Sequence, residues 1–200
     1  MSRPPAEIHP IEEESFRRLA ERIDLSHLPP LTRAVIARVI HATADLSFAD
    51  TMVVDEQAAA NAVQALAQGA PVITDVEMVR AGVRASKCFL EQARSSDHEH
   101  GAGLTLSARA IQLAAQAHPD GAIFAIGCAP TALEQLVTLT EQDKVRPVLV
   151  IGVPVGFVGA ADSKERLRTS AAHIASISNI GERGGSAVAA AIVNALGRQR

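Results

Sequence analysis

The run Pro147-Val148-Leu149-Val150-Ile151 stands directly before the glycine-rich segment Gly152-Val153-Pro154-Val155-Gly156-Phe157-Val158-Gly159, and a helix is expected over 162–171. A short apolar run without polar alternation predicts a strand buried on both faces, which is typical of a parallel sheet covered by helices. The same order of strand, loop and helix recurs on both sides of this stretch. The fold is therefore expected to consist of repeated strand and helix units.

Apolar runs bounded by turn residues predict further elements along the whole chain. The predicted strands cover 52–54, 71–75, 87–90, 122–126, 147–151 and 173–178, and the predicted helices cover 11–23, 32–42, 56–68, 76–83, 105–118, 132–142, 162–171 and 186–196. Asp75 or Thr74 is expected to cap the helix that follows it. Strands that alternate with helices imply a doubly wound parallel sheet, so we expect one three-layer α/β/α domain over residues 1–200.

Composition limits the classes of protein to consider. The chain has 200 residues, of which 48% are hydrophobic and 20% charged, with a formal charge of -3, which favours a globular protein with a sizeable core. The start of the chain has no apolar signal segment, and the longest uncharged apolar run, 148–161, is broken by glycine and proline and is shorter than the ~20 residues that span a bilayer. We therefore expect a cytoplasmic protein without a membrane segment.

Three smaller observations exclude other functions. Cys88 and Cys128 lie beside apolar strand-like runs and are expected to be buried, reduced thiols. The chain has no Trp or Tyr and no basic cluster, so nucleic acid is not expected as a partner. His98 and His100 lie near two acids, but no third ligand with regular spacing exists, so this segment is interpreted as a solvated loop and no metal is expected.

His41 is the residue with the most distinctive position. The helix over 32–42 carries an apolar stripe and ends just after His41, so the histidine lies in the last turn. The unpaired carbonyl groups there favour the imidazolium over the neutral imidazole. A histidine biased toward its acid form can lend a proton to a substrate, although histidine also closes helices for purely structural reasons.

Glycine-rich loops follow the strands at 122–126, 147–151 and 173–178. In a parallel sheet these loops share the carboxyl edge, where ligands bind, and each leads into a helix N-terminus that favours anions. Ser186 could cap the last helix or donate to a carboxylate. A ligand with several carboxylates would suit this edge. A nucleotide is the competing ligand, but neither G-x-G-x-x-G nor G-x-x-x-x-G-K-[ST] occurs, and glycines that serve only tight turns explain the same pattern.

Several long stretches together resemble the precorrin-8X methylmutase family of cobalamin biosynthesis, in one order from about Ile11 to Leu196. These stretches are Arg38-Val39-Ile40-His41, Pro71-Val72-Ile73-Thr74-Asp75-Val76-Glu77-Met78-Val79, Ala129-Pro130-Thr131-Ala132-Leu133, the glycine-rich segment with its continuation Ala160-Ala161-Asp162-Ser163-Lys164-Glu165, and Gly184-Gly185-Ser186-Ala187-Val188 with the helix after it.

The resemblance implies a cofactor-independent isomerase with a flavodoxin-like fold that acts as a homodimer. Its reaction would be a [1,5] shift of a methyl group on ring C of a modified tetrapyrrole, turning precorrin-8X into hydrogenobyrinic acid, a product that is held tightly. The catalytic histidine of the family falls on His41. Protonation of the macrocycle near ring C would lower the barrier to migration, which is a general-acid role.

A macrocycle edged with carboxylates needs dispersed anion donors and an apolar floor. Val155, Phe157 and Val158 are candidates for the floor. For the charged residues Arg38, Lys164 and Arg183, a surface ion pair or simple solvation is as good an explanation as substrate binding. The residues expected to bind substrate are Ser15, Arg38, Thr74, Gly127, Thr131, Gly156, Lys164, Arg183, Gly184, Gly185 and Ser186.

Three positions depart from the family pattern. Leu106 stands where an arginine is common, Cys128 where an asparagine is common, and Glu182 where a basic residue is usual. Losing a guanidinium and gaining a carboxylate would weaken the binding of a polyanion unless other donors compensate. Three alternatives therefore stay open: the cobalt-containing precorrin-8 as substrate, a non-catalytic binding protein for corrinoid intermediates, and a nucleotide-binding protein of flavodoxin type.

Overall fold

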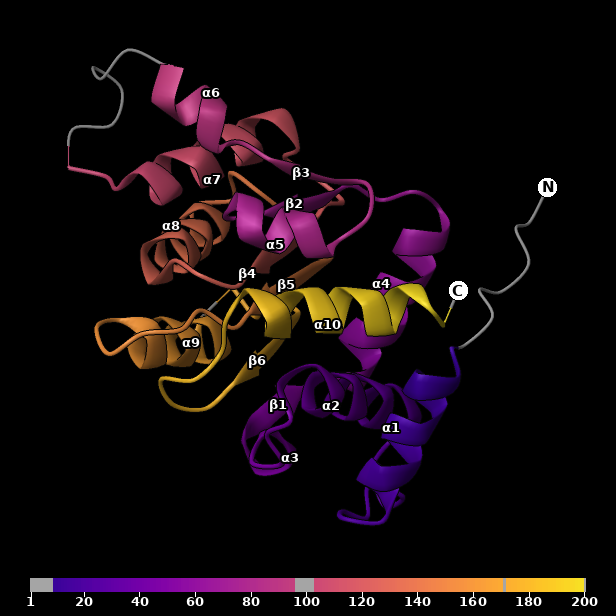
Figure 1. The fold of residues 1–200 in the computed structure, drawn as a ribbon. Helices are drawn as coiled ribbons and strands as arrows, with labels where there is room; N and C mark the ends of the chain where they lie inside the picture. Colours follow the sequence, from indigo (N-terminus) through magenta and orange to yellow (C-terminus); the bar gives the residue numbers. More distant parts are fainter. Residues whose placement is uncertain (1–8, 96–102, 171, 200) are drawn as a thin grey trace.

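The computed structural model describes residues 9–95, 103–170 and 172–199, and within them the strands form one six-stranded sheet in the order β1-β6-β5-β4-β2-β3. The strands β2 to β6 run parallel, and their spatial order is that of the flavodoxin-like doubly wound fold. The predicted fold class is therefore confirmed (Figure 1). The bounds are β1 Met52–Val54, β2 Val72–Thr74, β3 Ser86–Cys88, β4 Ile123–Ile126, β5 Leu149–Gly152 and β6 Ser176–Asn179.

The edge strand β1 departs from the prediction of a purely parallel sheet. It pairs with β6 in the antiparallel direction, with Val53 opposite Ser178. The first of the paired strands therefore runs against the other strands of the sheet. Val53 is exposed and its neighbours are only partly buried, so β1 lacks the continuous burial that characterises the parallel strands.

Two layers of helices cover the two faces of the sheet. Successive strand residues point to opposite faces, so Ile123 and Ala125 join one core while Phe124 and Ile126 join the other. The first core contains residues of α2, α4, α5 and α10, and the second contains residues of α7, α8 and α9. The helices are α1 Pro10–Ala20, α2 Pro30–Thr43, α3 Phe48–Thr51, α4 Glu56–Ala67, α5 Glu77–Gly82, α6 Leu90–Ser95, α7 Leu106–Ala117, α8 Pro130–Glu141, α9 Ala160–Thr169 and α10 Ser186–Gly197.

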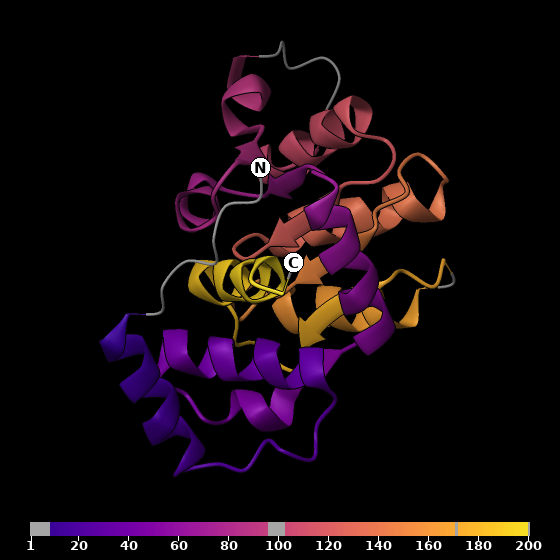
Figure 2. The ribbon, with the colours of Figure 1, turned by 90° about the vertical axis from the view of Figure 1, so that its right-hand side faces the viewer.

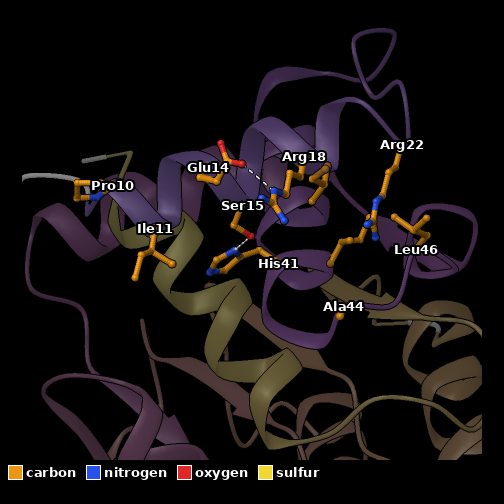
Figure 3. Close-up of a pocket in the computed structure, with 11 residues that line it drawn as sticks. Pro10, Ile11, Glu14, Ser15, Arg18, Arg22, His41, Ala44 and Leu46 are labelled. Carbon is orange, nitrogen blue, oxygen red and sulfur yellow. Dashed lines mark hydrogen bonds and ion pairs between the residues drawn. The ribbon is translucent and has the colours of Figure 1, made fainter.

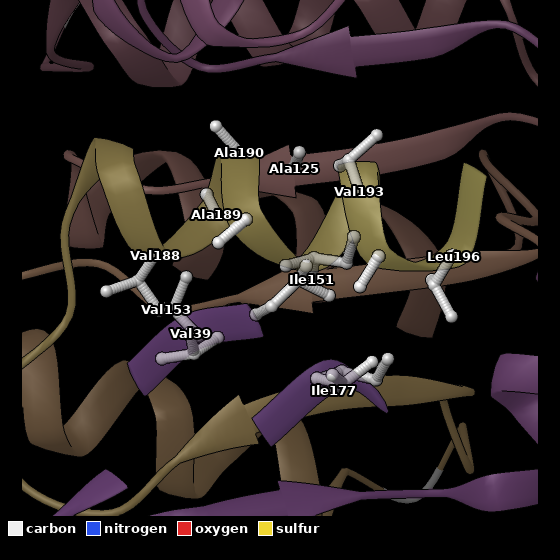
Figure 4. Close-up of a cluster of buried hydrophobic side chains, with 14 of the residues drawn as sticks. Val39, Ala125, Ile151, Val153, Ile177, Val188, Ala189, Ala190, Val193 and Leu196 are labelled. Carbon is white, nitrogen blue, oxygen red and sulfur yellow. The ribbon is translucent and has the colours of Figure 1, made fainter. Parts of the chain in front are cut away.

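Helix α10 lies between the sheet and α2 and is buried around most of its surface. Val188, Ile192 and Leu196 are at most 1% exposed, and they pack with Val39 of α2 and Ile151 of β5 (Figure 4). A helix that is apolar on all sides must lose water on all sides, which explains its central place. Helix α1 packs against α2 and lies outside the layered part of the fold (Figure 2).

Small residues let α10 approach its neighbours closely. A Cβ at Gly82 would lie 2.8 Å from Cβ of Ala190, and one at Gly127 would lie 2.9 Å from Cβ of Ala189. These glycines keep α10 against α5 and against the loop after β4. Their role is close packing, because neither Gly82 nor Gly127 has a positive φ.

The loops after β5 and β6 are bonded to each other. The N–H of Gly156 donates to the carbonyl of Glu182 at 3.1 Å, and the N–H of Gly185 donates to the carbonyl of Val153 at 2.9 Å. Gly184 has a φ of +153° between these bonds, and a Cβ there would lie only 2.1 Å from the carbonyl oxygen of Val153. Gly184 is therefore required by contact as well as by backbone conformation.

Two expectations about local structure are wrong. Neither Asp75 nor Thr74 caps α5, because Val76 occupies the N-cap position and no side chain bonds there. Cys128 is exposed, whereas a buried thiol was expected; Cys88 is partly buried, and both are free thiols. The segment that holds His98 and His100 lies outside the described residues. Among the helices that the structure describes, none is long and apolar enough to span a membrane.

The contact at Gly184 predicts a specific loss of stability. Gly184→Ala should destabilise the fold by about 3 kcal/mol or more, since it adds a steric clash to an unfavourable backbone conformation. Gly181→Ala is the matched control, because Gly181 has a φ of +83° and no atom lies within 4 Å of the position of its Cβ. It should lose only about 1 kcal/mol. Urea unfolding measures both, and equal losses would contradict the role of the contact.

Candidate active site

His41 lies in the last turn of α2, as the sequence predicts, and it lines a cavity of about 610 Å³. The helix ends at Ala44, which adopts the left-handed conformation with a φ of 54°. This volume falls in the range of small-molecule sites. The lining comes from α1, the end of α2 and the residues after each of them: Pro10, Ile11, Glu14, Ser15, Arg18, Leu19, Arg22, Ile40, His41, Ala44 and Leu46 (Figure 3).

Two consecutive residues of α1 hold the imidazole ring. Oγ of Ser15 lies 2.7 Å from Nδ1 of His41, and the ring of Phe16 stacks on the imidazole with centroids 5.0 Å apart and 18° between the planes. When the ring is an imidazolium, Nδ1–H donates to Ser15 and the ring keeps its orientation. Nε2 is then the nitrogen left without a partner among the described residues, and it can carry a proton to a bound molecule.

Glu12 fixes α1 in the place where Ser15 meets His41. Its carboxylate accepts from Arg38 of α2, and it also accepts from Nη2 of Arg198, just after α10, at 3.1 Å. The hydrogen bond from Arg198 and the charge and bond of Arg38 lower the pKa of Glu12 to about 2, against the opposing effect of burial. Arg38 was expected to bind substrate, but its guanidinium is engaged by Glu12 and it does not line the cavity.

The connection after α2 is tied to the loop after β6. Nη1 of Arg183 donates to Oδ2 of Asp45 and to Oγ of Ser47. Bonds from Ser47, together with the charge of Arg183, hold the pKa of Asp45 below its ordinary value. Arg183 therefore joins the His41 end of α2 to the carboxyl edge of the sheet, and its side chain is still 62% exposed.

Lys164 does not face solvent, contrary to its expected role as a donor to substrate. It is fully buried, and Nζ donates to the carbonyl of Arg183 at 2.6 Å and to Oδ1 of Asn179 at 3.2 Å. Burial, and then the charge of Arg168, lower the pKa of Lys164 to about 8. Asn179 also donates to the carbonyl of Arg183, at 2.8 Å. Lys164 thus positions the backbone from which Arg183 extends.

The anion site expected at Gly127 is filled by the protein itself. Asp75, which is fully buried, accepts from the N–H groups of Gly127 at 3.1 Å, Cys128 at 2.8 Å and Ala129 at 2.8 Å. This carboxylate holds the loop that leads into α8, while the first turn of α8 itself has no side-chain cap. Burial raises the pKa of Asp75, and the three N–H donors oppose that rise. The crevice between β2 and β4 is the switch point of the sheet, where a nucleotide would bind in this fold.

Two other predicted residues near this crevice are also engaged. Thr74 is buried and its hydroxyl donates to the carbonyl of Lys87 at 3.3 Å. The hydroxyl of Thr131 lies 2.7 Å from that of Thr105, the N-cap of α7. Neither lines the His41 cavity. The crevice therefore offers little to an added anion.

The last group of predicted residues lies in the paired loops. The N–H groups of Gly156 and Gly185 are taken by the loop bonds, and Gly184 is in contact with Val153. Ser186 is the first residue of α10 and does not cap it, since Gly185 is the N-cap. No side chain caps α9 or α10, so their first N–H groups can receive anions.

Of the residues that line the cavity, Ser15 and His41 were predicted from the sequence as site residues, and Arg18 and Arg22 were not. Phe16, which stacks on the ring of His41, was not predicted either. The spacing of Arg18 and Arg22 from Ser15 places them on one helical face, but only the packing of α1 on α2 shows what that face meets. Helical periodicity from Ser15 was the one signal that could have found Arg18 and Arg22.

The three departures from the family pattern have separate surroundings. Leu106 begins α7 and packs against the small core between α6 and α7. Cys128 is exposed, and burial followed by the charge of Asp75 raises the pKa of its thiol. The side chain of Glu182 is exposed while its carbonyl accepts from Gly156.

Within the described part of the chain, no group of three His, Cys, Asp or Glu residues could hold a metal ion.

The geometry defines a flavodoxin-like α/β protein with a histidine cavity between α1 and the end of α2, and comparisons with known proteins identify the family. The family model for precorrin-8X methylmutase matches residues 10–199. The cobalt-precorrin-8 methylmutase of Methanocaldococcus jannaschii is 38% identical over 81% of this chain and 77% of its own, and the precorrin-8X methylmutase of Pseudomonas aeruginosa is 36% identical over 95% of each.

A solved structure agrees with these matches. A precorrin-8X methylmutase from Thermus thermophilus superposes with a TM-score of 0.81 at 31% identity, over 95% of this chain and 96% of that one. The chain belongs to the precorrin-8X methylmutase family of cobalamin biosynthesis. It is an enzyme of the intramolecular transferase or isomerase class.

The clamp at Glu12 predicts a pH-dependent loss of stability. Glu12→Gln should lower the free energy of unfolding by about 1–3 kcal/mol at pH 7, because two guanidinium groups lose their carboxylate. The pKa of Glu12 is about 2 in the fold, against an ordinary value of 4.5, so its contribution is complete above pH 4.5 and declines as the pH falls toward 2. The difference between the variant and the unchanged protein should shrink over that range.

Glu13→Gln provides the control, since Glu13 is an exposed neighbour on the same helix and forms no ion pair with any residue that the structure describes. Chemical denaturation at several pH values measures all three proteins. A difference for Glu12→Gln that stays constant from pH 5 to pH 2.5 would show that the carboxylate charge is not the source of the stability.

Proposed function

We propose that the enzyme converts precorrin-8X to hydrogenobyrinic acid by a [1,5] methyl migration on ring C, with His41 as the general acid. The observation that carries the proposal is the fixed imidazole, with Nδ1 held by Ser15, the ring stacked on Phe16, and Nε2 unpaired at a cavity. General acids need this combination of fixed orientation and a proton on the open side.

The proposed reaction is balanced without a cofactor. One carbon–carbon bond to the methyl group breaks and another forms within the same molecule. Nε2–H of His41 lends its proton to the macrocycle near ring C, which makes the conjugated system electron-poor and lowers the barrier to migration. The proton returns to Nε2 when the conjugation of the product is complete. Ser15 stabilises the imidazolium before transfer and keeps the ring in place after it.

The substrate carboxylates have donors on the side of the site toward the sheet. Arg183 is exposed beside the end of α2, and Ser186 stands at the uncapped N-terminus of α10. The loop after β5 supplies the proposed apolar floor, because Phe157 is 91% and Val158 88% exposed. Such side chains lose their contact with water when a flat macrocycle covers them.

A cobalt-containing substrate is the second candidate. The relative from Methanocaldococcus jannaschii is named a cobalt-precorrin-8 methylmutase and matches this chain at 38% identity. The migration takes place at ring C, so the acid chemistry of His41 serves either substrate. A nucleotide is disfavoured as the ligand, since the carboxylate of Asp75 fills the crevice where this fold would bind one.

Substitution of His41 tests the reaction. His41→Ala should bind precorrin-8X but lower the rate of conversion by at least about 100-fold, since general acids contribute about 10²–10⁴. The absorption spectrum of precorrin-8X with a catalytic amount of protein measures conversion, and the cobalt form is assayed in parallel. His27→Ala serves as control, because His27 is exposed and lies outside the cavity. Ser15→Ala should give an intermediate rate.

The alternatives give different spectra. A shift proportional to the protein added, without further change in time, would mean a binding protein for corrinoid intermediates. Equal rates for the unchanged enzyme and His41→Ala would remove His41 from the reaction. Conversion of the cobalt form alone would assign the enzyme to that substrate.

We propose that the enzyme is a cytoplasmic homodimer that does not bind nucleic acid. The charge-poor helix α10 offers little surface for dimerisation, because most of it packs inside the core. Support comes instead from Ile180, an apolar residue just after β6 that is 55% exposed.

Dimerisation predicts a mass in solution twice that of one chain. Sedimentation equilibrium measures it over a range of concentrations, and a mass of one chain throughout would exclude the dimer. Ile180→Ser should weaken the association, because it removes apolar surface that a partner would cover. Met78→Ser is the control, because it removes an exposed apolar side chain from another element, α5, and should leave the mass unchanged.

A further inference from the structure

Two guanidinium groups extend from α1 to the cavity of His41. Arg18 lies in the last turn of α1, and Arg22 lies in the turn that follows, where its N–H donates to the carbonyl of Leu19 at 2.9 Å. Residues four apart on a helical turn lie on one face, so both reach the side of the helix that carries Ser15. Figure 3 shows Arg18 beside Ser15 and His41, and Arg22 extending toward Leu46.

The two groups differ in their partners. Nε of Arg18 donates to Oε1 of Glu14 at 2.7 Å, and the same carboxylate accepts two bonds from Arg17. The guanidinium of Arg22 has no hydrogen bond or ion pair with any residue in the described ranges. Arg18 is therefore bound to a carboxylate that already has another cation, whereas all the side-chain donors of Arg22 are free.

The charges that line the cavity do not balance. One carboxylate, Glu14, faces the two guanidinium groups of Arg18 and Arg22, and Arg17, which does not line the cavity, also draws on Glu14. The chain as a whole carries a formal charge of -3, so this local excess of positive charge runs against the average. The apolar side chains of Leu19, Ile40 and Leu46 stand beside it and strengthen electrostatic attraction by excluding water.

We propose that Arg18 and Arg22 form a carboxylate-binding pair that holds two neighbouring carboxylate groups of the substrate beside His41. Arg22 binds one carboxylate in bidentate fashion, and Arg18 binds the second while Glu14 keeps Arg17. This assignment rests on the proposed function, which supplies a ligand edged with carboxylates. Arg38 and Lys164 were expected to bind the substrate carboxylates, but both are bonded inside the fold. Arg18 and Arg22 take over this role in the proposal.

The pair also bears on the departure at Leu106. A guanidinium that the family pattern commonly places at the start of α7 is absent from this chain, and α1 offers two at the cavity. Carboxylates surround the edge of the macrocycle, so a guanidinium on α1 can bind one of them as well as a guanidinium on α7 can. The pair therefore supplies cationic donors from α1 where the family pattern supplies one from α7.

Binding of hydrogenobyrinic acid tests the pair without requiring turnover. Its absorption spectrum reports binding in a chain without Trp or Tyr. Arg22→Gln should raise the Kd about tenfold, and Arg18→Gln by a smaller factor because Glu14 shares its charge. Arg33→Gln is the matched control, since Arg33 is exposed on α2, its side chain has no partner among the described residues, and it lies outside the cavity.

A second ligand separates charge recognition from packing. With a derivative whose peripheral carboxyl groups are amidated, Arg22→Gln and Arg33→Gln should have equal Kd values. With hydrogenobyrinic acid itself, added salt should raise the Kd of Arg22→Gln by a smaller factor than it raises the Kd of the unchanged protein. Equal Kd values for the acid in Arg22→Gln and Arg33→Gln would overturn the pair and leave the proposed function in place. Absence of binding by the unchanged protein would overturn the proposed substrate and the pair together.

Discussion

The burial of α10 between the sheet and α2 is the constraint on which the rest of the structure depends. Val188, Ile192 and Leu196 pack against strand residues on one side and against α2 on the other. Because α10 has no polar face, it must be covered on every side, and α2 provides one part of that cover. The position of His41 at the end of α2 follows from this packing, together with the tie from Arg183 to Asp45.

Charged groups inside the fold serve to position backbone. Asp75 holds the loop after β4, Lys164 holds the loop after β6, and Glu12 holds α1 against α2 and the end of α10. Each has its hydrogen-bonding capacity met by the protein, as buried charge requires. Nε2 of His41 and the guanidinium of Arg22 have no partner among the described residues, and both lie at the cavity. Both are therefore available to a bound molecule.

The site of this enzyme is displaced from the crevice that the doubly wound sheet would offer. Asp75 occupies the crevice between β2 and β4, and the cavity of His41 is built by α1 and the end of α2, beside the loops after β5 and β6. Contacts across the end of α2, from Arg183 to Asp45 and Ser47, connect the cavity to the carboxyl edge of the sheet.

Apolar runs such as 122–126 and 147–151, with the glycines after them, were enough to predict the layers, the parallel strands and the helix whose last turn holds His41, because these depend on local periodicity. The antiparallel pairing of β1, the bond of Ser15 to His41 and the engagement of Arg38, Lys164 and Asp75 could not be predicted, because each joins residues that only packing brings together. Sequence alone determined which residue types were present near the site. Tertiary structure decided which of them kept a free donor, because hydrogen-bond partners distant in sequence are chosen by the packing of helices on the sheet.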